Sequence, residues 1–167
     1  HDTEWGKPVY DDEKIFEFLV VETFQAGLSW HTILKKRENF RKAFDRFDYK
    51  KVAQYNEAKV QELLLDAGII RNQLKIRGTI TNAILFMKVQ EEFGTFSKYI
   101  WNFVDGKPID NNPKTLKDVP ATTKISDTLS KDLKKRGFKF VGSTVVYAHM
   151  QATGMVNDHA ADCWTRK

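Results

Sequence analysis

Residues 15–30 read IFEFLVVETFQAGLSW, and the apolar spacing in them predicts a helix that carries a carboxylate on its buried face. Ile15, Phe18 and Leu19 recur at helical spacing, and Glu22 takes the next position on the same stripe. Burying a carboxylate is costly unless a partner compensates its charge. The position therefore predicts either a salt bridge from Glu22 to a Lys or Arg, or a site for a cationic ligand.

The end of this helix predicts an aromatic neighbour for Glu22. Gly27 interrupts the helical pattern, and Ser29 is a suitable N-cap for a second helix that places Trp30 across a tight turn from the acid. A carboxylate beside an aromatic ring suits a flat cationic heterocycle, held by stacking, cation–π attraction and charge-assisted hydrogen bonds. The segment alone also allows a simpler interpretation, in which Glu22 pairs with a basic side chain and Trp30 fills the core.

Composition predicts one globular domain, because 167 residues that are 41% hydrophobic can bury a substantial core. A formal charge of +5 is compatible with a polyanionic partner without proving one. No apolar run approaches the roughly 20 residues of a membrane span, so we expect a cytoplasmic protein without a membrane partner. Cys163 is the only cysteine, which excludes an internal disulfide. The chain begins at His1 rather than Met, so we expect native sequence before it.

Nearly the whole chain is predicted to be helical. Capping residues and helix breakers delimit the expected helices, which run from Asp11 or Asp12 to about Gln25, Ser29 to about Phe44, Asp48 to Tyr55, Glu57 to Leu65, Asn72 to Phe93, Phe96 to Val104, Ser126 to Arg136 and Gly142 to Thr153. Residues 105–123 contain three prolines and predict a long surface loop.

A glycine-containing connection, Asp66-Ala-Gly-Ile-Ile-Arg71, lies between two helical patterns. Gly68 allows a sharp bend, and the amides at the start of the next helix could hold a DNA phosphate without reading sequence. Arg71, Lys75 and Arg77 would strengthen that contact. An ordinary helix–glycine–helix connection is the simpler interpretation of this segment alone.

A candidate metal site lies near the end of the chain. His159 and Cys163 have a His-x3-Cys spacing that brings both side chains to one face of a helical turn. Imidazole and thiolate are preferred donors for structural zinc, which takes four ligands in a tetrahedron. His1 is a third candidate, and a fourth ligand could precede it. A lone His/Cys pair near a terminus is more often incidental.

Six segments spread over the chain form one pattern. They are HDTEWG (1–6), ETFQAGLSW (22–30), LKKREN (34–39), DAGIIR (66–71), SKDLKKRGFKFVG (130–142) and GMVNDH (154–159). In this order they closely resemble the DNA-3-methyladenine glycosylase I (Tag-type) enzymes. The resemblance implies an all-α helix–hairpin–helix DNA glycosylase fold with a small zinc-stabilised helical lobe formed by the termini. Residues 1–167 would form a single glycosylase domain, with a central lobe at about 29–125.

The resemblance also implies the activity. It predicts a monofunctional N-glycosyl hydrolase of base excision repair that flips 3-methyladenine out of alkylated double-stranded DNA and releases the free base. We expect such an enzyme to be a monomer in the bacterial cytoplasm, associated with the nucleoid.

The residue roles follow from the same resemblance. Glu22 is the implied catalytic residue and hydrogen-bonds the damaged base, on which Trp30 stacks, and Trp5 adds to the base pocket. The implied DNA-binding residues, at the gap in the duplex and along its backbone, are Gly27, Leu28, Gly68, Ile69, Ile70 and Arg71. The implied ligands of one structural zinc ion are His1, His159 and Cys163. In the family a cysteine ligand and a pocket tyrosine lie upstream of the position that His1 occupies.

The expected chemistry needs little acid catalysis, because methylation at N3 leaves the adenine cationic and lets it depart as a neutral base. Most helix–hairpin–helix glycosylases carry an Asp beyond the hairpin, yet residues 72–104 contain none, and Glu91 and Glu92 are expected to be solvated. Two rival classes are a DNA-binding module that has lost its chemistry and a metal-dependent hydrolase. The retained Glu22 and Trp30 argue against the first, and the absence of further clustered ligands argues against the second.

Overall fold

The computed structural model of the chain describes residues 6–25, 29–111 and 119–157, with the side chain of Trp30 excepted. The elements follow one another along the chain as α1 (Asp12–Gln25), α2 (Trp30–Ala43), the 3-10 turn η1 (Asp45–Phe47), α3 (Tyr49–Val52), α4 (Glu57–Leu64), α5 (Gln73–Phe93), α6 (Phe96–Trp101), the 3-10 turn η2 (Asn102–Val104), β1 (Ile109–Asp110), α7 (Lys124–Lys135), α8 (Ser143–Ala152) and β2 (Val156–Asn157). The structure is thus mostly helical, as the sequence predicts.

Side-chain caps set most of the helix starts. Ser29, Asn56 and Asn72 each accept a hydrogen bond from a backbone N–H in the first turn of the helix that follows, so the predicted starts of α2, α4 and α5 are confirmed. Helix α7 begins two residues earlier than predicted. Its true N-cap is Thr123, whose side chain and that of Ser126 bond each other's backbone N–H in a capping box.

Two local features are absent from the sequence prediction. In η1 three consecutive residues, Asp45, Arg46 and Phe47, have φ of 52°, 58° and 60°, a left-handed conformation that no glycine announces. The turn places Phe47 in the core. The predicted surface loop also contains β1, which pairs in parallel with β2 so that Ile109 lies beside Val156.

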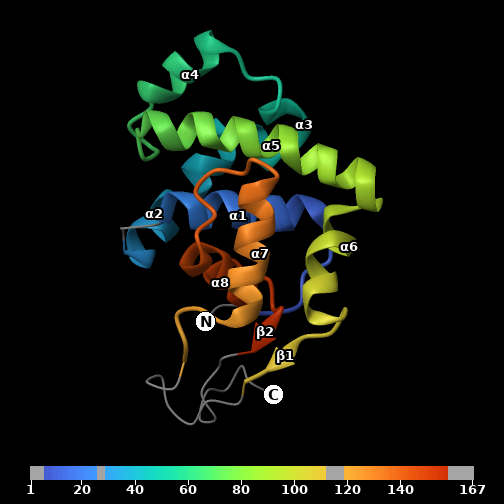
Figure 1. The fold of residues 1–167 in the computed structure, drawn as a ribbon. Helices are drawn as coiled ribbons and strands as arrows, with labels where there is room; N and C mark the ends of the chain where they lie inside the picture. Colours follow the sequence, from blue (N-terminus) through green and yellow to red (C-terminus); the bar gives the residue numbers. More distant parts are fainter. Residues whose placement is uncertain (1–5, 26–28, 112–118, 158–167) are drawn as a thin grey trace.

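Helix α1 is the centre of the fold. It packs against α2, α5, α6 and α8, and in Figure 1 it runs across the middle of the molecule with α5 on one side and α8 on the other. All of its residues from Ile15 to Phe24 are buried. The sequence predicted one buried face, but every face of α1 is buried between Ile15 and Phe24, because other helices pack around it.

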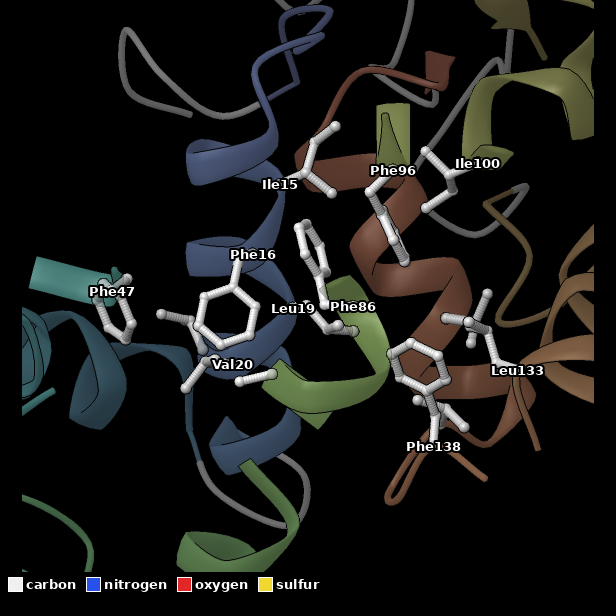
Figure 2. Packing of buried hydrophobic residues seen from close by; sticks show 14 of the residues in the cluster. Ile15, Phe16, Leu19, Val20, Phe47, Phe86, Phe96, Ile100, Leu133 and Phe138 are labelled. Atoms are coloured by element: carbon white, nitrogen blue, oxygen red, sulfur yellow. The ribbon is translucent and has the colours of Figure 1, made fainter. Parts of the chain in front are cut away.

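Aromatic side chains fill the space around α1. Figure 2 shows Phe16 of α1, Phe86 of α5 and Phe96 of α6 converging. The rings of Phe86 and Phe96 stack with centroids 4.1 Å apart, and Phe16 meets Phe86 edge-on at 5.3 Å. The buried hydrophobic residues form one contiguous cluster that reaches from α1 to Val156.

The first described residues lie against the end of α8. The N–H of Gly6 donates to the carbonyl of Ala152 at 3.1 Å, and the N–H of Val9 donates to that of Thr153 at 2.9 Å. Gly154, with φ of 74°, packs so closely that a Cβ there would lie 2.4 Å from the carbonyl carbon of Lys7. Backbone bonding thus joins segments near the two ends of the chain. No helix in the described ranges is long and apolar enough to cross a membrane.

Candidate functional site

Two glutamates are buried on α1, and they differ in their partners. Glu17 is 6% exposed and Glu22 is 2% exposed. The Oε2 atom of Glu17 accepts hydrogen bonds from Arg37 at 2.7 and 3.0 Å and from Arg41 at 2.9 and 3.2 Å, both on α2. Glu17 therefore makes a salt bridge of the kind that was one of the two predicted alternatives for Glu22, and the sequence pattern had not singled out Glu17.

Glu22 is buried without such compensation. Its Oε1 atom has no hydrogen-bond partner among the described residues. Burial raises the pKa of Glu22 from 4.5 to about 8, because a charged carboxylate is poorly solvated inside the protein. The carboxyl group is therefore mostly neutral at pH 7. It would ionise if a cation entered the space beside it, and this is the behaviour of a receptor for a positively charged ligand.

Two basic side chains tie α1 to two other helices, one near Glu22 and one near the start of α1. Lys75, in the first turn of α5, donates to the carbonyl of Phe24 at 3.5 Å, so the start of α5 lies at the end of α1. Burial lowers the pKa of Lys75. On α8, His149 donates through Nε2 to the carbonyl of Ile15 at 3.1 Å, and burial lowers its pKa to about 4. His149 is therefore a neutral structural link between α8 and α1.

The aromatic side chains of the predicted pocket lie outside what the structure describes. Trp30 is the first residue of α2 and follows the N-cap Ser29, as predicted, but its side chain is not described. Trp5, Gly27 and Leu28 lie outside the described residues. The stacking of Trp30 and the roles of these three residues stay predictions.

The connection between α4 and α5 is a tight turn braced by α2. The N–H of Gly68 donates to Oδ1 of Asp66 at 2.8 Å, and Lys36 of α2 approaches the carbonyl of Ala67 at 3.4 Å. Gly68 does not have a positive φ. It is needed for space instead, because a Cβ there would lie 3.1 Å from Cγ of Asn39. The chain bends here as predicted, and the constraint on Gly68 is the close approach of Asn39 and not a positive φ.

The turn offers backbone amides rather than apolar side chains. Within the described part of the chain the N–H groups of Ala67, Ile70 and Arg71 have no hydrogen-bond acceptor. Ile69 is only 3% exposed, so its side chain belongs to the core and does not face a ligand. Uncommitted amides at the start of a helix form an anion site when its surface is accessible.

The basic residues near the turn are not equivalent. Arg77 donates to both carboxylate oxygens of Glu57 at 2.7 and 2.8 Å, so its charge is neutralised. Lys75 faces the end of α1. Arg71 is exposed and has no acidic partner among the residues described. Of the three cations predicted to strengthen a phosphate contact, Arg71 is the one that the structure leaves available.

The predicted zinc ligands His1, His159 and Cys163 all lie outside the described residues. Among the described residues, no group of three or more His, Cys, Asp or Glu side chains is placed to hold a metal ion. The zinc site stays a prediction.

Comparisons with known proteins place this geometry in context. The whole chain, residues 1–167, matches the family described as methyladenine glycosylase. It is 49% identical over 163 residues to DNA-3-methyladenine glycosylase 1 of Escherichia coli (strain K12), an alignment that covers 98% of this chain and 87% of that protein.

Two solved structures are also similar. A crystal structure of 3-methyladenine DNA glycosylase I (TAG) superposes with a TM-score of 0.95 at 47% identity, covering 100% of this chain and 92% of the other. A variant of 3-methyladenine DNA glycosylase I (TAG) in complex with 3-methyladenine superposes with a TM-score of 0.97 at 36% identity, covering 100% of this chain and 90% of the other.

Proposed function

Because the chain belongs to the methyladenine glycosylase family, we propose that it is a monofunctional DNA glycosylase that hydrolyses the N-glycosidic bond of 3-methyladenine in alkylated double-stranded DNA. Relatives of high identity carry that name, and one similar structure is a complex with 3-methyladenine. The enzyme would act in the bacterial cytoplasm as part of base excision repair.

The observation that carries the proposal is the buried carboxyl group of Glu22, whose Oε1 has no hydrogen-bond partner among the described residues. The rise of its pKa from 4.5 to about 8 means that ionising it in the empty site costs about 5 kcal/mol more than in water. A base methylated at N3 brings the missing positive charge, so Glu22 ionises and forms a charge-assisted hydrogen bond. Neutral adenine cannot provide that charge. Specificity thus arises from differential binding of a charge that ordinary bases lack.

Base flipping brings the lesion to Glu22. A base inside the duplex cannot reach a buried carboxyl group, so the nucleotide rotates out of the stack at a cost of a few kcal/mol, which is lower for a damaged base. Trp30 stacks on the flipped base, and Trp5 adds to the base pocket. Gly27 and Leu28 occupy the gap that the flipped nucleotide leaves in the duplex. Because the cationic base leaves as a neutral molecule, water can attack the sugar without a strong general acid.

The turn between α4 and α5 holds the DNA as a helix–hairpin–helix element. Its uncommitted amides at Ala67, Ile70 and Arg71 suit a phosphate oxygen, and the Arg71 guanidinium adds a charge that does not depend on sequence. Lys75 links this element to the end of α1, two residues beyond Glu22. Phosphate binding and base recognition are therefore mechanically connected.

A structural zinc ion would hold the two ends of the chain together. The backbone bonds of Gly6 and Val9 to the end of α8 support this, because they bring the segment after His1 towards the segment before His159. His1, His159 and Cys163 are of the donor types that zinc prefers, and the fourth ligand would precede His1. Metal analysis of the purified protein should give one zinc per chain, and its removal should lower stability.

A base-release assay tests the function. The protein should free 3-methyladenine from a methylated duplex without added metal and should free no base from unmodified DNA. Glu22→Gln should weaken binding of the free base about 10- to 100-fold, since a hydrogen bond to a charged group is lost, while affinity for unmodified duplex persists. A protein that only binds DNA would free nothing, and a metal-dependent hydrolase would stop working on chelation while still folded.

A further inference from the structure

We propose that Lys139 and Phe140, on the turn between α7 and α8, form a second DNA contact beside the α4–α5 hairpin, and that Asn82 is the residue that positions them. We call residues 136–142 the α7–α8 turn. The proposal rests on the function proposed above, because it assigns a further part of the surface to the same DNA substrate.

Asn82 clamps the turn onto α5. It is 2% exposed, its Nδ2 donates to the carbonyl of Lys139 at 3.0 Å, and its Oδ1 accepts from the N–H of Lys139 at 2.8 Å. Both polar groups of a buried amide are thus satisfied by one backbone position. Ser130 adds a hydrogen bond of 2.5 Å to the carbonyl of Val141. Phe138 lies in the core near Leu133 (Figure 2). The backbone on both sides of Phe140 is therefore held rigidly.

Phe140 is held in a strained conformation with its ring at the surface. Its φ is 59°, in the left-handed region that side chains with a Cβ rarely adopt, and 39% of the residue is exposed. The ring rests on α5 at Gly78, where a Cβ would lie 2.9 Å from Cε2 of Phe140. A glycine inside a helix is itself unfavourable. Two unfavourable features thus combine to keep an apolar ring partly in water, which favours a binding role.

Four basic residues precede this ring along the chain, and they differ in their acidic partners. Arg136 is neutralised by Asp132 at 2.9 Å and by Glu92 at 2.6 Å. Lys134, Lys135 and Lys139 are exposed. The charge of Lys135 acts on Asp132, whereas Lys134 and Lys139 have no acidic partner within the described ranges. An exposed ring among unpaired lysines suits a nucleic-acid backbone, in which phosphates alternate with apolar sugar faces. Lys139 would bind a phosphate, and Phe140 would pack on the adjoining sugar.

The position of the turn matches the proposed DNA path. Gly78 is five residues beyond the first residue of α5, Gln73, so the Phe140 ring lies roughly 7.5 Å along the helix axis from the end of α5 that follows the hairpin. That is about two nucleotide steps of 3.4 Å measured along the axis of the DNA. Figure 1 shows the turn leaving the end of α7 and running beside α5. One strand can therefore touch both the hairpin and the turn.

The salt dependence of binding to a labelled, undamaged duplex tests the role of Lys139. Each phosphate neutralised by a basic residue contributes about 0.9 to the slope of log K against log salt. Lys139→Ala should lower that slope by about 0.9. Lys88→Ala removes the same charge from an exposed site on α5 and should leave the slope unchanged. Equal slopes for the two variants would overturn the contact.

The role of Phe140 has a control in Phe93, which is 38% exposed at the far end of α5 and whose ring packs beside Arg136 and Tyr99. Phe140→Ala should weaken duplex binding about 5-fold or more, whereas Phe93→Ala should not. Phe140→Asn removes the ring but tolerates the left-handed backbone, so it should also bind weakly while its Tm stays within about 2 °C of the unchanged protein. Unchanged affinity in Phe140→Asn would refute the role of the ring.

Asn82→Ala tests positioning. The slope of log K against log salt should fall as much in Asn82→Ala as in Lys139→Ala, and the variant with both substitutions should show no further loss. Binding of free 3-methyladenine should persist. An unchanged slope, or an equal loss of free-base binding, would mean a purely structural role. If the unchanged protein released no 3-methyladenine, the proposed function would be wrong. If it released 3-methyladenine and all these variants bound the duplex as well as the unchanged protein does, only this inference would be wrong.

Discussion

Replacing Glu22 by Gln should make the stability of the ligand-free protein less dependent on pH. Folded Glu22 keeps its proton up to a pKa of about 8, whereas the unfolded chain releases it near 4.5. Between these values the unfolded state binds fewer protons, so the stability of the unchanged protein falls as pH rises. Gln does not titrate, and the variant avoids this loss.

The magnitude follows from the pKa difference. The free energy of unfolding of Glu22→Gln, relative to that of the unchanged protein, should rise by up to about 1.4 kcal/mol per pH unit. Over the interval from 4.5 to about 8 the full gain approaches about 5 kcal/mol, and above it the difference is constant. His149 titrates in both proteins, so its contribution cancels.

Urea unfolding at several pH values between 5 and 9 measures this slope. The buried amide of Gln adds a cost of its own, but that cost is independent of pH, so the slope is the decisive quantity. For Glu22→Leu, the unfolding free energy relative to the unchanged protein should rise with pH at the same rate as for Glu22→Gln, although its absolute value will differ. A difference in unfolding free energy that stayed flat from pH 5 to 8 would show that the carboxyl group is compensated in the folded protein, and the proposed receptor for a cation would be wrong.

Three further substitutions probe other parts of the fold and site. Glu17→Gln leaves the Arg37 and Arg41 side chains without their buried carboxylate and should cost about 3–5 kcal/mol in urea unfolding; a loss under 1 kcal/mol would mean that the pair adds little. Gly154→Ala forces a Cβ to within 2.4 Å of backbone and should cost about 3 kcal/mol, whereas Gly142→Ala, with open space around it, should cost far less. Gly68→Val should crowd the side chain 3.1 Å away and slow base release from duplex DNA while affinity for free 3-methyladenine persists; equal losses of both would indicate general unfolding.

The sequence alone determined the features that depend on neighbours within about one helical turn. The N-caps Ser29, Asn56 and Asn72 and the stop at Gly94 could be predicted, because the groups that they satisfy are three or four residues away. The segments spread along the chain also sufficed to identify the family, and the comparisons confirm this. The three left-handed residues of η1 could not be predicted, because none of them is a glycine and tertiary packing imposes the conformation.

Only the tertiary structure decided which polar groups are compensated. Glu17 and Glu22 look alike in the sequence, yet Glu17 meets arginines 20 and 24 residues away and Glu22 meets no described partner for Oε1. The clamp from Asn82 to Lys139 spans 57 residues. Hydrophobic burial holds α1 in the centre without regard to direction, whereas a hydrogen bond needs its partner within about 3 Å. Periodicity therefore predicts which residues are buried, and only packing decides which buried carboxyl group has a partner and which is left to receive a ligand.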